Sequence, residues 1–154
     1  MKNLKVKVVL FLLFTLMLCP GTQITAREIY AENLQDLVNL INWSLSQEKG
    51  NQDDALKKVE LKNNDLVFYT TLNFKGQIPA SLLSGKMDEL KETTKKSFLE
   101  TMADMLCPDY LPLLEKEKTG FQLKAKIQNP SGHFEIQIPH AEFMDYLTTN
   151  DKLN

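Results

Sequence analysis

The chain has 154 residues, of which 43% are hydrophobic and 25% are charged, and its formal net charge is −2 at pH 7. This acidic balance, with charges interspersed, argues against nucleic acid or an anionic membrane surface as a partner, because both require a clustered positive surface. Two cysteines are too few for a disulfide scaffold.

The N-terminus has the pattern of a secretory signal peptide. Lys2, Lys5 and Lys7 precede an apolar run from Val8 to Leu18, and Ala26 is a small residue at a plausible cleavage point. We therefore expect an exported protein, either periplasmic or secreted. The 11-residue run at about 1.5 Å per residue is too short for a hydrocarbon core of roughly 30 Å. We expect no transmembrane segment in the mature chain.

Cleavage after Ala26 leaves 128 residues with a net charge of −5, because the removed segment carries three basic residues and no acidic ones. Cleavage also removes Cys19 and leaves Cys107 alone. An alternative for Cys19 is lipid attachment, since the residues before it resemble a lipoprotein signal box, although Leu18 is bulkier than that box requires. Cys107 is predicted to be a small buried hydrophobe at a helix end, with a reactive or intermolecular thiol as the less favoured interpretation.

The first predicted element of the mature chain is an amphipathic helix that ends at Lys49-Gly50. A cation in the last turn and a glycine after it are typical of a helix C-terminus. Within the helix, Asn42-Trp43-Ser44 matches the glycosylation pattern, which matters only in a eukaryotic secretory pathway. The apolar residues at helical spacing are Tyr30, Leu34, Leu37, Val38, Ile41 and Leu45.

After this helix, apolar residues alternate with other residues on both sides of Asn63-Asn64. This pattern predicts a hairpin with the two asparagines at its turn. Asparagine tolerates the positive φ that tight hairpin turns require. Pairing Leu61 with Leu66 places Val59 beside Phe68 on the apolar face of the hairpin.

Two regions near this hairpin are candidate contact sites. The opposite face of its second strand is more apolar than a solvated face needs, so we expect it to be partly covered or to form a contact surface. The following loop over residues 75–85 contains apolar residues that either pin it as a crossover or project from it for recognition. The candidate partner contacts are Val67, Tyr69, Thr71, Ile78, Leu82 and Leu83.

A long helix is predicted from Met87 to Met105 and a short one from Pro112 to Lys118. Pro108 stops the first of these, because the residue before a proline is pushed out of the helical region. Proline suits the first turn of the second, with Gly120 just past its end. The apolar stripe of the long helix is Met87, Leu90, Phe98, Met102 and Met105, with Thr94 filling the gap.

The second hairpin is predicted around the turn over residues 129–132. If Ile127 pairs with Phe134, the apolar residues of both strands share one face, and Lys126 lies opposite Glu135 on the other. After this hairpin, Ala141–Leu147 is expected to form one or two helical turns.

The predicted fold is α+β, in the order α-β-β-α-β-β. It is an antiparallel four-stranded sheet from two hairpins, with two long helices on one face. We expect a signal peptide over residues 1–26, a single domain over 27–147 and a polar tail over 148–154. The apolar sheet face is Val59, Leu61, Leu66, Phe68, Leu123, Ile127, Phe134 and Ile136.

Three sequence runs carry a resemblance to known proteins. They are Asp65–Leu72 (DLVFYTTL), Gly120–Ile127 (GFQLKAKI) and His133–Ile138 (HFEIQI), with a Lys/Glu-rich helix between the first and the second. Over about Asp65 to Phe143 the chain resembles small exported bacterial proteins of uncharacterised function. The resemblance implies export and an α+β fold, and it supplies no activity and no functional residue.

The residues fit no common catalytic template, and we predict no catalytic, cofactor-binding or metal-binding residue. The chain lacks nucleophile-elbow, phosphate-loop, zincin and Cys-x-x-Cys motifs. A Cys107–His140 dyad would still need an orienting group and an oxyanion site. His133 and Glu135 supply two metal ligands, fewer than the three or four of a zinc site.

The leading hypothesis is an exported, non-catalytic domain that binds a protein or a small ligand. The alternative is a periplasmic or extracellular enzyme inhibitor that presents the loop over residues 76–85, and a hydrolase is third. A loop that projects from the domain would favour the inhibitor, whereas an open second face of the sheet would favour the binding domain.

Overall fold

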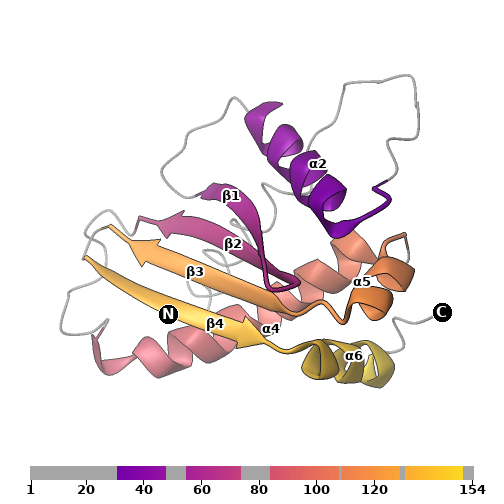
Figure 1. The fold of residues 1–154 in the computed structure, drawn as a ribbon. Helices are drawn as coiled ribbons and strands as arrows, with labels where there is room; N and C mark the ends of the chain where they lie inside the picture. The colour runs from indigo at the N-terminus through magenta and orange to yellow at the C-terminus, as the bar shows by residue number, and fades with distance from the viewer. Residues whose placement is uncertain (1–30, 48–54, 74–83, 108, 129–130, 151–154) are drawn as a thin grey trace.

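The computed structural model describes residues 31–47, 55–73, 84–107, 109–128 and 131–150, and these form an α+β fold (Figure 1). The predicted signal peptide and the loop residues Ile78, Leu82 and Leu83 lie outside this part of the chain. The elements in chain order are α2 (Leu34–Gln47), β1 (Ala55–Lys62), β2 (Asp65–Leu72), α4 (Met87–Leu106), α5 (Leu111–Glu117), β3 (Phe121–Ile127), β4 (Gly132–Ile138) and α6 (His140–Thr149).

The first hairpin confirms its predicted register. Leu61 pairs with Leu66, and Val59 pairs with Phe68. Both turn residues have positive φ, 50° for Asn63 and 67° for its neighbour Asn64. Asparagine at both positions therefore determines the geometry of the tight turn and, through it, the register of β1 and β2.

The sheet is mixed, so the prediction of a purely antiparallel sheet is wrong. Its strand order is β1-β2-β3-β4, and the two hairpins meet where β2 runs parallel to β3. A parallel pair requires a crossover connection, which α4 and α5 provide between these strands. Leu66 at the start of β2 therefore pairs with Phe121 at the start of β3.

The second hairpin exists as predicted, but its register differs by two residues. Ile127 pairs with Gly132 rather than with Phe134, which lies opposite Ala125. A shift of two residues leaves every side chain on its predicted face, because successive side chains of a strand alternate between faces. The alternating pattern could therefore specify the faces but not choose between these two registers.

Helix α4 packs on the apolar face of the sheet and lies behind the strands in Figure 1. The Phe98 ring of α4 meets Phe68 of β2 edge-on, with 5.3 Å between ring centroids. Met102 is buried, as its place in the apolar stripe predicted. Leu99 and Leu106 are also buried, so the packed face of α4 is wider than that stripe.

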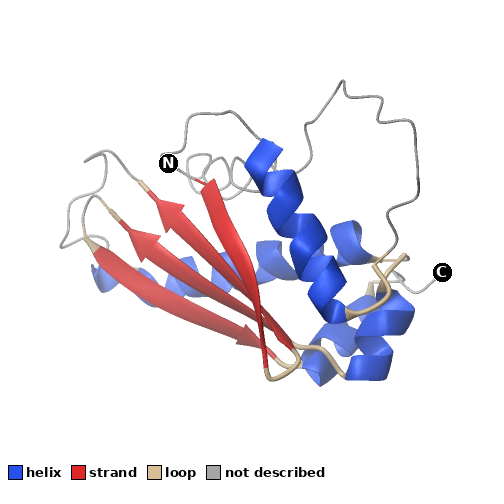
Figure 2. Ribbon diagram, turned by 45° about the horizontal axis from the view of Figure 1, so that its top comes forward, coloured by secondary structure: helices blue, strands red, loops and turns tan. Residues whose placement is uncertain are grey.

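The other long helix, α2, lies against β1 at the edge of the sheet (Figures 1 and 2). The predicted placement of both long helices over one face is therefore correct for α4 only. Asn33 caps α2, because its side-chain oxygen accepts from the Asp36 backbone N–H at 2.9 Å. The buried residues of α2 are Leu34, Leu37, Val38 and Ile41.

The short helices differ from their predictions only at their ends. Helix α5 closes at Lys118, which adopts the left-handed conformation (φ 51°) expected for a glycine. Helix α6 runs to Thr149, into the predicted polar tail.

Lys95 of α4 and Glu142 of α6 form an ion pair at 2.7 Å. None of the described helices has both the length and the apolar character of a membrane span.

Candidate functional site

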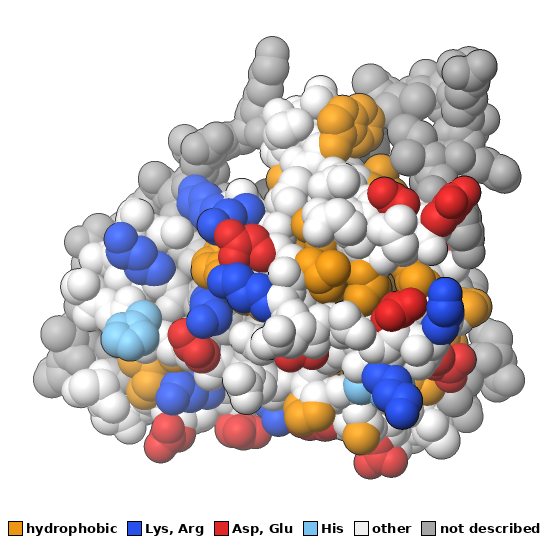
Figure 3. All heavy atoms as spheres, in the orientation of Figure 1, with side chains coloured by type: hydrophobic (Ala, Val, Ile, Leu, Met, Phe, Trp, Pro, Cys, Tyr) orange, Lys and Arg blue, Asp and Glu red, His pale blue; other side chains and the backbone are white. Residues whose placement is uncertain are grey.

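The face of the sheet opposite α4, here called the outer face, carries polar side chains from all four strands. Its residues alternate along each strand with those that face the core, although Val67 and Thr71 of β2 are themselves buried. Lysine side chains gather over the strands in the left half of Figure 3, among a few acidic groups and one histidine. Its residues are Lys57, Lys58, Glu60, Lys62, Asp65, Val67, Tyr69, Thr71, Gln122, Lys124, Lys126, His133, Glu135 and Gln137.

The three candidate contacts of β2 lie together on this outer face, but they differ in exposure. Val67 is fully buried although it lies outside the core cluster, and Thr71 is 8% exposed. Glu60 of β1 and Gln122 of β3 pair with Val67 from its two sides. Tyr69 is the most accessible of the three, so a partner on this face would meet Tyr69 rather than Val67.

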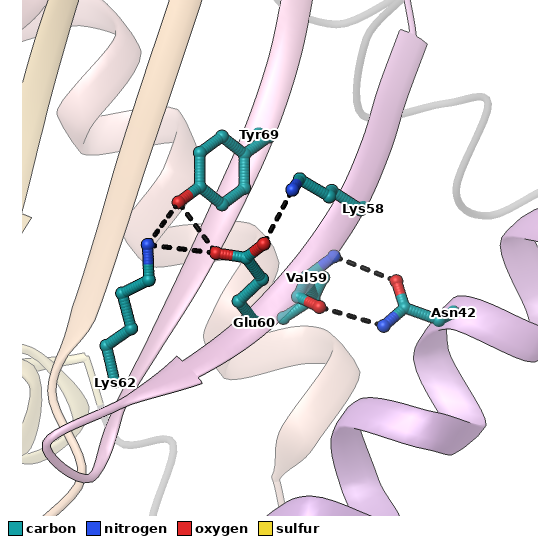
Figure 4. Close-up of polar contacts among 6 residues, drawn as sticks. All are labelled: Asn42, Lys58, Val59, Glu60, Lys62 and Tyr69. Atoms are coloured by element: carbon teal, nitrogen blue, oxygen red, sulfur yellow. Dashed lines mark hydrogen bonds and ion pairs between the residues drawn. The ribbon is translucent and has the colours of Figure 1, made fainter.

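Tyr69 is held in a polar network with three charged residues of β1 (Figure 4). Its hydroxyl donates to Glu60 Oε2 at 2.8 Å and accepts from Lys62 Nζ at 2.7 Å. Lys58 forms an ion pair with the same carboxylate, and its ammonium lies 4.6 Å from the centroid of the Tyr69 ring. These contacts keep the ring in one position beside the neighbouring lysines.

The network also alters the acidity of its members. The ion pairs with Lys58 and Lys62, in that order, and the Tyr69 hydroxyl lower the pKa of Glu60 from 4.5 to about 2. The pKa of Lys62 is raised, first by its hydrogen bond to Tyr69 and then by Glu60. Glu60 therefore keeps its negative charge over the whole physiological range and neutralises part of the positive charge of β1.

Beyond this network the outer face is hollowed into a shallow depression of about 520 Å³ that is open to solvent. Tyr69 and Thr71 of β2 line it together with charged residues of β3 and β4. The charged or titratable groups in its wall are Lys57, Lys124, Lys126, His133 and Glu135.

The ion pair inside this depression corrects a prediction from the sequence. Glu135 bonds to Lys124 at 3.2 Å, not to Lys126, because the register of the second hairpin differs by two residues. Lys126 instead lies opposite His133. Within the described ranges, no carboxylate forms an ion pair with Lys126.

Cys107 and His140, considered from the sequence as a catalytic pair, lie outside the depression. Burial, followed by the charges of Asp104 and Glu115, raises the pKa of the Cys107 thiol. His140 Nδ1 lies 3.1 Å from the Thr119 carbonyl oxygen. Because a carbonyl only accepts, this contact places the proton on Nδ1. The described residues contain no cluster of three potential metal ligands.

The lysines of β3 were not among the contacts predicted from the sequence, which assigned Lys126 only to an ion pair with Glu135. They border the candidate residues of β2. Lys124 pairs with Tyr69, and Lys126 pairs with Thr71. This proximity depends on the parallel β2–β3 pair, which joins segments 55 residues apart in the chain. The alternation of lysines in β3 was visible in the sequence, but the neighbouring strand could not be identified from it.

Comparisons of the chain with protein-family models, with curated proteins and with solved structures give no match. The outer face must therefore be interpreted from its own geometry and charge.

Proposed function

We propose that this chain is an exported, non-catalytic binding domain and that the outer face of its sheet is the contact surface. The observation that carries the proposal is the open depression over β2, β3 and β4, lined mainly by outer-face side chains that lie outside the core cluster. Sheet faces in small domains are normally packed or uniformly solvated. Here one such face combines a fixed aromatic ring, Tyr69, with an array of charged groups.

The shape of the depression favours a protein partner over a small ligand. Pockets for small molecules enclose most of the ligand surface and are lined mainly by apolar side chains. This depression is open and cannot enclose a small ligand, and its wall combines apolar atoms with the polar ends of charged and hydroxyl-bearing side chains. Such a surface resembles a protein–protein interface, with Tyr69 as an aromatic contact.

The environments of Cys107 and His140 support a non-catalytic role. A thiol whose pKa is raised has little of the thiolate form that acts as a nucleophile. His140 Nδ1 is engaged with the Thr119 carbonyl oxygen. Neither residue lines the depression.

Site-specific photo-crosslinking in the producing cell tests the contact surface. A photoreactive phenylalanine replaces Ser131, which is exposed at the depression, and, as the control, Lys96, which is exposed on α4. We expect a discrete crosslinked partner from position 131 and none from position 96. Equal crosslinking from both positions, or none from either, would refute the outer face as the contact surface.

Intact mass of the chain recovered from outside the cytoplasm tests the proposed export. We expect a mass that corresponds to a chain beginning at Arg27. A chain that begins at a lipid-modified Cys19 would instead show membrane anchoring. Recovery of the chain only in the cytoplasm would contradict export.

A further inference from the structure

We infer that the partner of the outer face is acidic, and that it presents a protein segment rich in Asp and Glu to the β3–β4 side of the depression. This inference rests on the proposed function, because it names the chemistry of the partner for the same surface. The site residues are Lys124, Lys126 and His133, with the Tyr69 ring beside them.

Charge is unevenly distributed over the surface of the chain. The whole chain has a net charge of −2. The outer face, by contrast, carries five lysines, at positions 57, 58, 62, 124 and 126, against three carboxylates, at positions 60, 65 and 135. A positive surface on an acidic protein attracts acidic partners and disfavours contact with the same surface of another copy.

Two of the three carboxylates of this face lie away from the depression. Glu60 is held by Lys58 and Lys62 at the β1 edge. Asp65 accepts from the Gly120 backbone N–H at 3.1 Å and from the Gln122 side chain at 3.0 Å. The lining of the depression contains one carboxylate, Glu135, against the three lysines at positions 57, 124 and 126.

Lys126 occupies a special position within the depression. Glu135 bonds to Lys124, so Lys126 faces the imidazole of His133 across the strand pair instead of a carboxylate. Two potential cations thus lie directly opposite each other, and both are exposed. A carboxylate placed between them would accept hydrogen bonds from both side chains.

A binding assay with synthetic peptides tests this inference. Fluorescein-labelled decamers of Glu, Gln and Lys are titrated with the chain purified from the exported fraction, and binding is followed by fluorescence anisotropy. We expect the Glu decamer to bind and the other two not to bind. Because the contacts are solvent-exposed charges, the affinity should fall steeply as salt is raised.

Two matched charge reversals locate the binding. Lys126→Glu should weaken binding of the Glu decamer about three- to tenfold, because it reverses the charge opposite His133. Lys96→Glu is the control, since Lys96 is likewise exposed and lies on α4, across the sheet from the depression. Circular dichroism of both variants verifies that the fold is retained. An equal loss of affinity in both variants, or in neither, would overturn the inference.

The outcomes separate this inference from the proposed function. If position 131 crosslinks to a partner but the Glu decamer does not bind, the binding surface stands and the acidic partner is refuted. If vesicles containing phosphatidylglycerol bind the chain and the Glu decamer does not, the anionic ligand is a lipid surface and the inference is wrong. If position 131 fails to crosslink, the proposed function fails, whatever the decamer does.

Discussion

The side-chain amide of Asn42 on α2 makes two hydrogen bonds to the backbone of Val59 on β1. The Val59 N–H donates to Asn42 Oδ1 at 2.8 Å, and Asn42 Nδ2 donates to the Val59 carbonyl oxygen at 2.8 Å (Figure 4). The amide thus pairs with β1 as the backbone of another strand would. Helix α2 thereby covers part of the edge of the sheet at β1. Without this cover, the free backbone groups of β1 could pair with another chain.

We predict that Asn42→Ala lowers the free energy of unfolding by about 1–3 kcal/mol, because both partly buried backbone groups of Val59 lose their partner. Urea denaturation measures this loss, and hydrogen exchange should show faster exchange of the Val59 amide. Asn39→Ala is the control, since Asn39 is exposed on the same helix and bonds only to Gln35. A similar small change, within about 0.5 kcal/mol, in both variants would contradict the role of Asn42.

The same contact bears on the glycosylation pattern at Asn42. A sugar attached to Nδ2 would occupy the atom that donates to Val59. The folded domain therefore disfavours modification at this position.

We predict that Gly120→Ala destabilises the parallel junction of β2 and β3. An added methyl group would lie 2.7 Å from Asp65 Oδ1 and 3.0 Å from the Ile138 carbonyl oxygen. The same carboxylate oxygen accepts from the Gly120 N–H, so it cannot move away without losing that bond. We expect a loss of about 1–3 kcal/mol in the free energy of unfolding, measured by thermal or urea denaturation.

Gly85→Ala is the matched control for that substitution. A methyl group at Gly85 meets nothing within 4 Å, and the residue lies in a helical turn just before α4. Alanine there should be neutral or stabilise the protein by up to about 1 kcal/mol. Equal destabilisation by both substitutions would show that the contact with Asp65 is not the cause.

We predict that Glu60 contributes to stability in a pH-dependent way. Its pKa is about 2 in the folded protein and 4.5 without these contacts, so the folded state favours the ionised carboxylate. The contribution is therefore complete above about pH 4.5 and is lost as the pH falls toward 2. The difference in unfolding free energy between the wild type and Glu60→Gln should shrink over this interval. A difference that stays constant from pH 6 to pH 3 would contradict the lowered pKa.

The parts of the fold that depend on local chemistry were predictable from the sequence. The Asn63-Asn64 turn and the alternation beside it determine the register of the first hairpin, and the apolar stripe predicts α4. The parallel β2–β3 pair was not predictable, because its strands are separated by two helices and meet through main-chain pairing and the bonds of Asp65 with Gly120 and Gln122. The candidate site depends on that pair, so its lysines were not predicted as partner contacts.

In the second hairpin, the alternation of apolar and polar residues specifies the faces of the strands but not their register. Alternation is unchanged by a shift of two residues, so the sequence alone assigned Glu135 to Lys126, whereas the structure pairs it with Lys124 at 3.2 Å. A double-mutant cycle with alanine at positions 124 and 135 should give a coupling energy of about 0.2–1 kcal/mol in urea denaturation, as for other exposed cross-strand ion pairs. The cycle at positions 126 and 135 should give a value near zero. The reverse result would support the register predicted from the sequence and would return Lys126 to an internal ion pair, which would remove the main charge argument for an acidic partner.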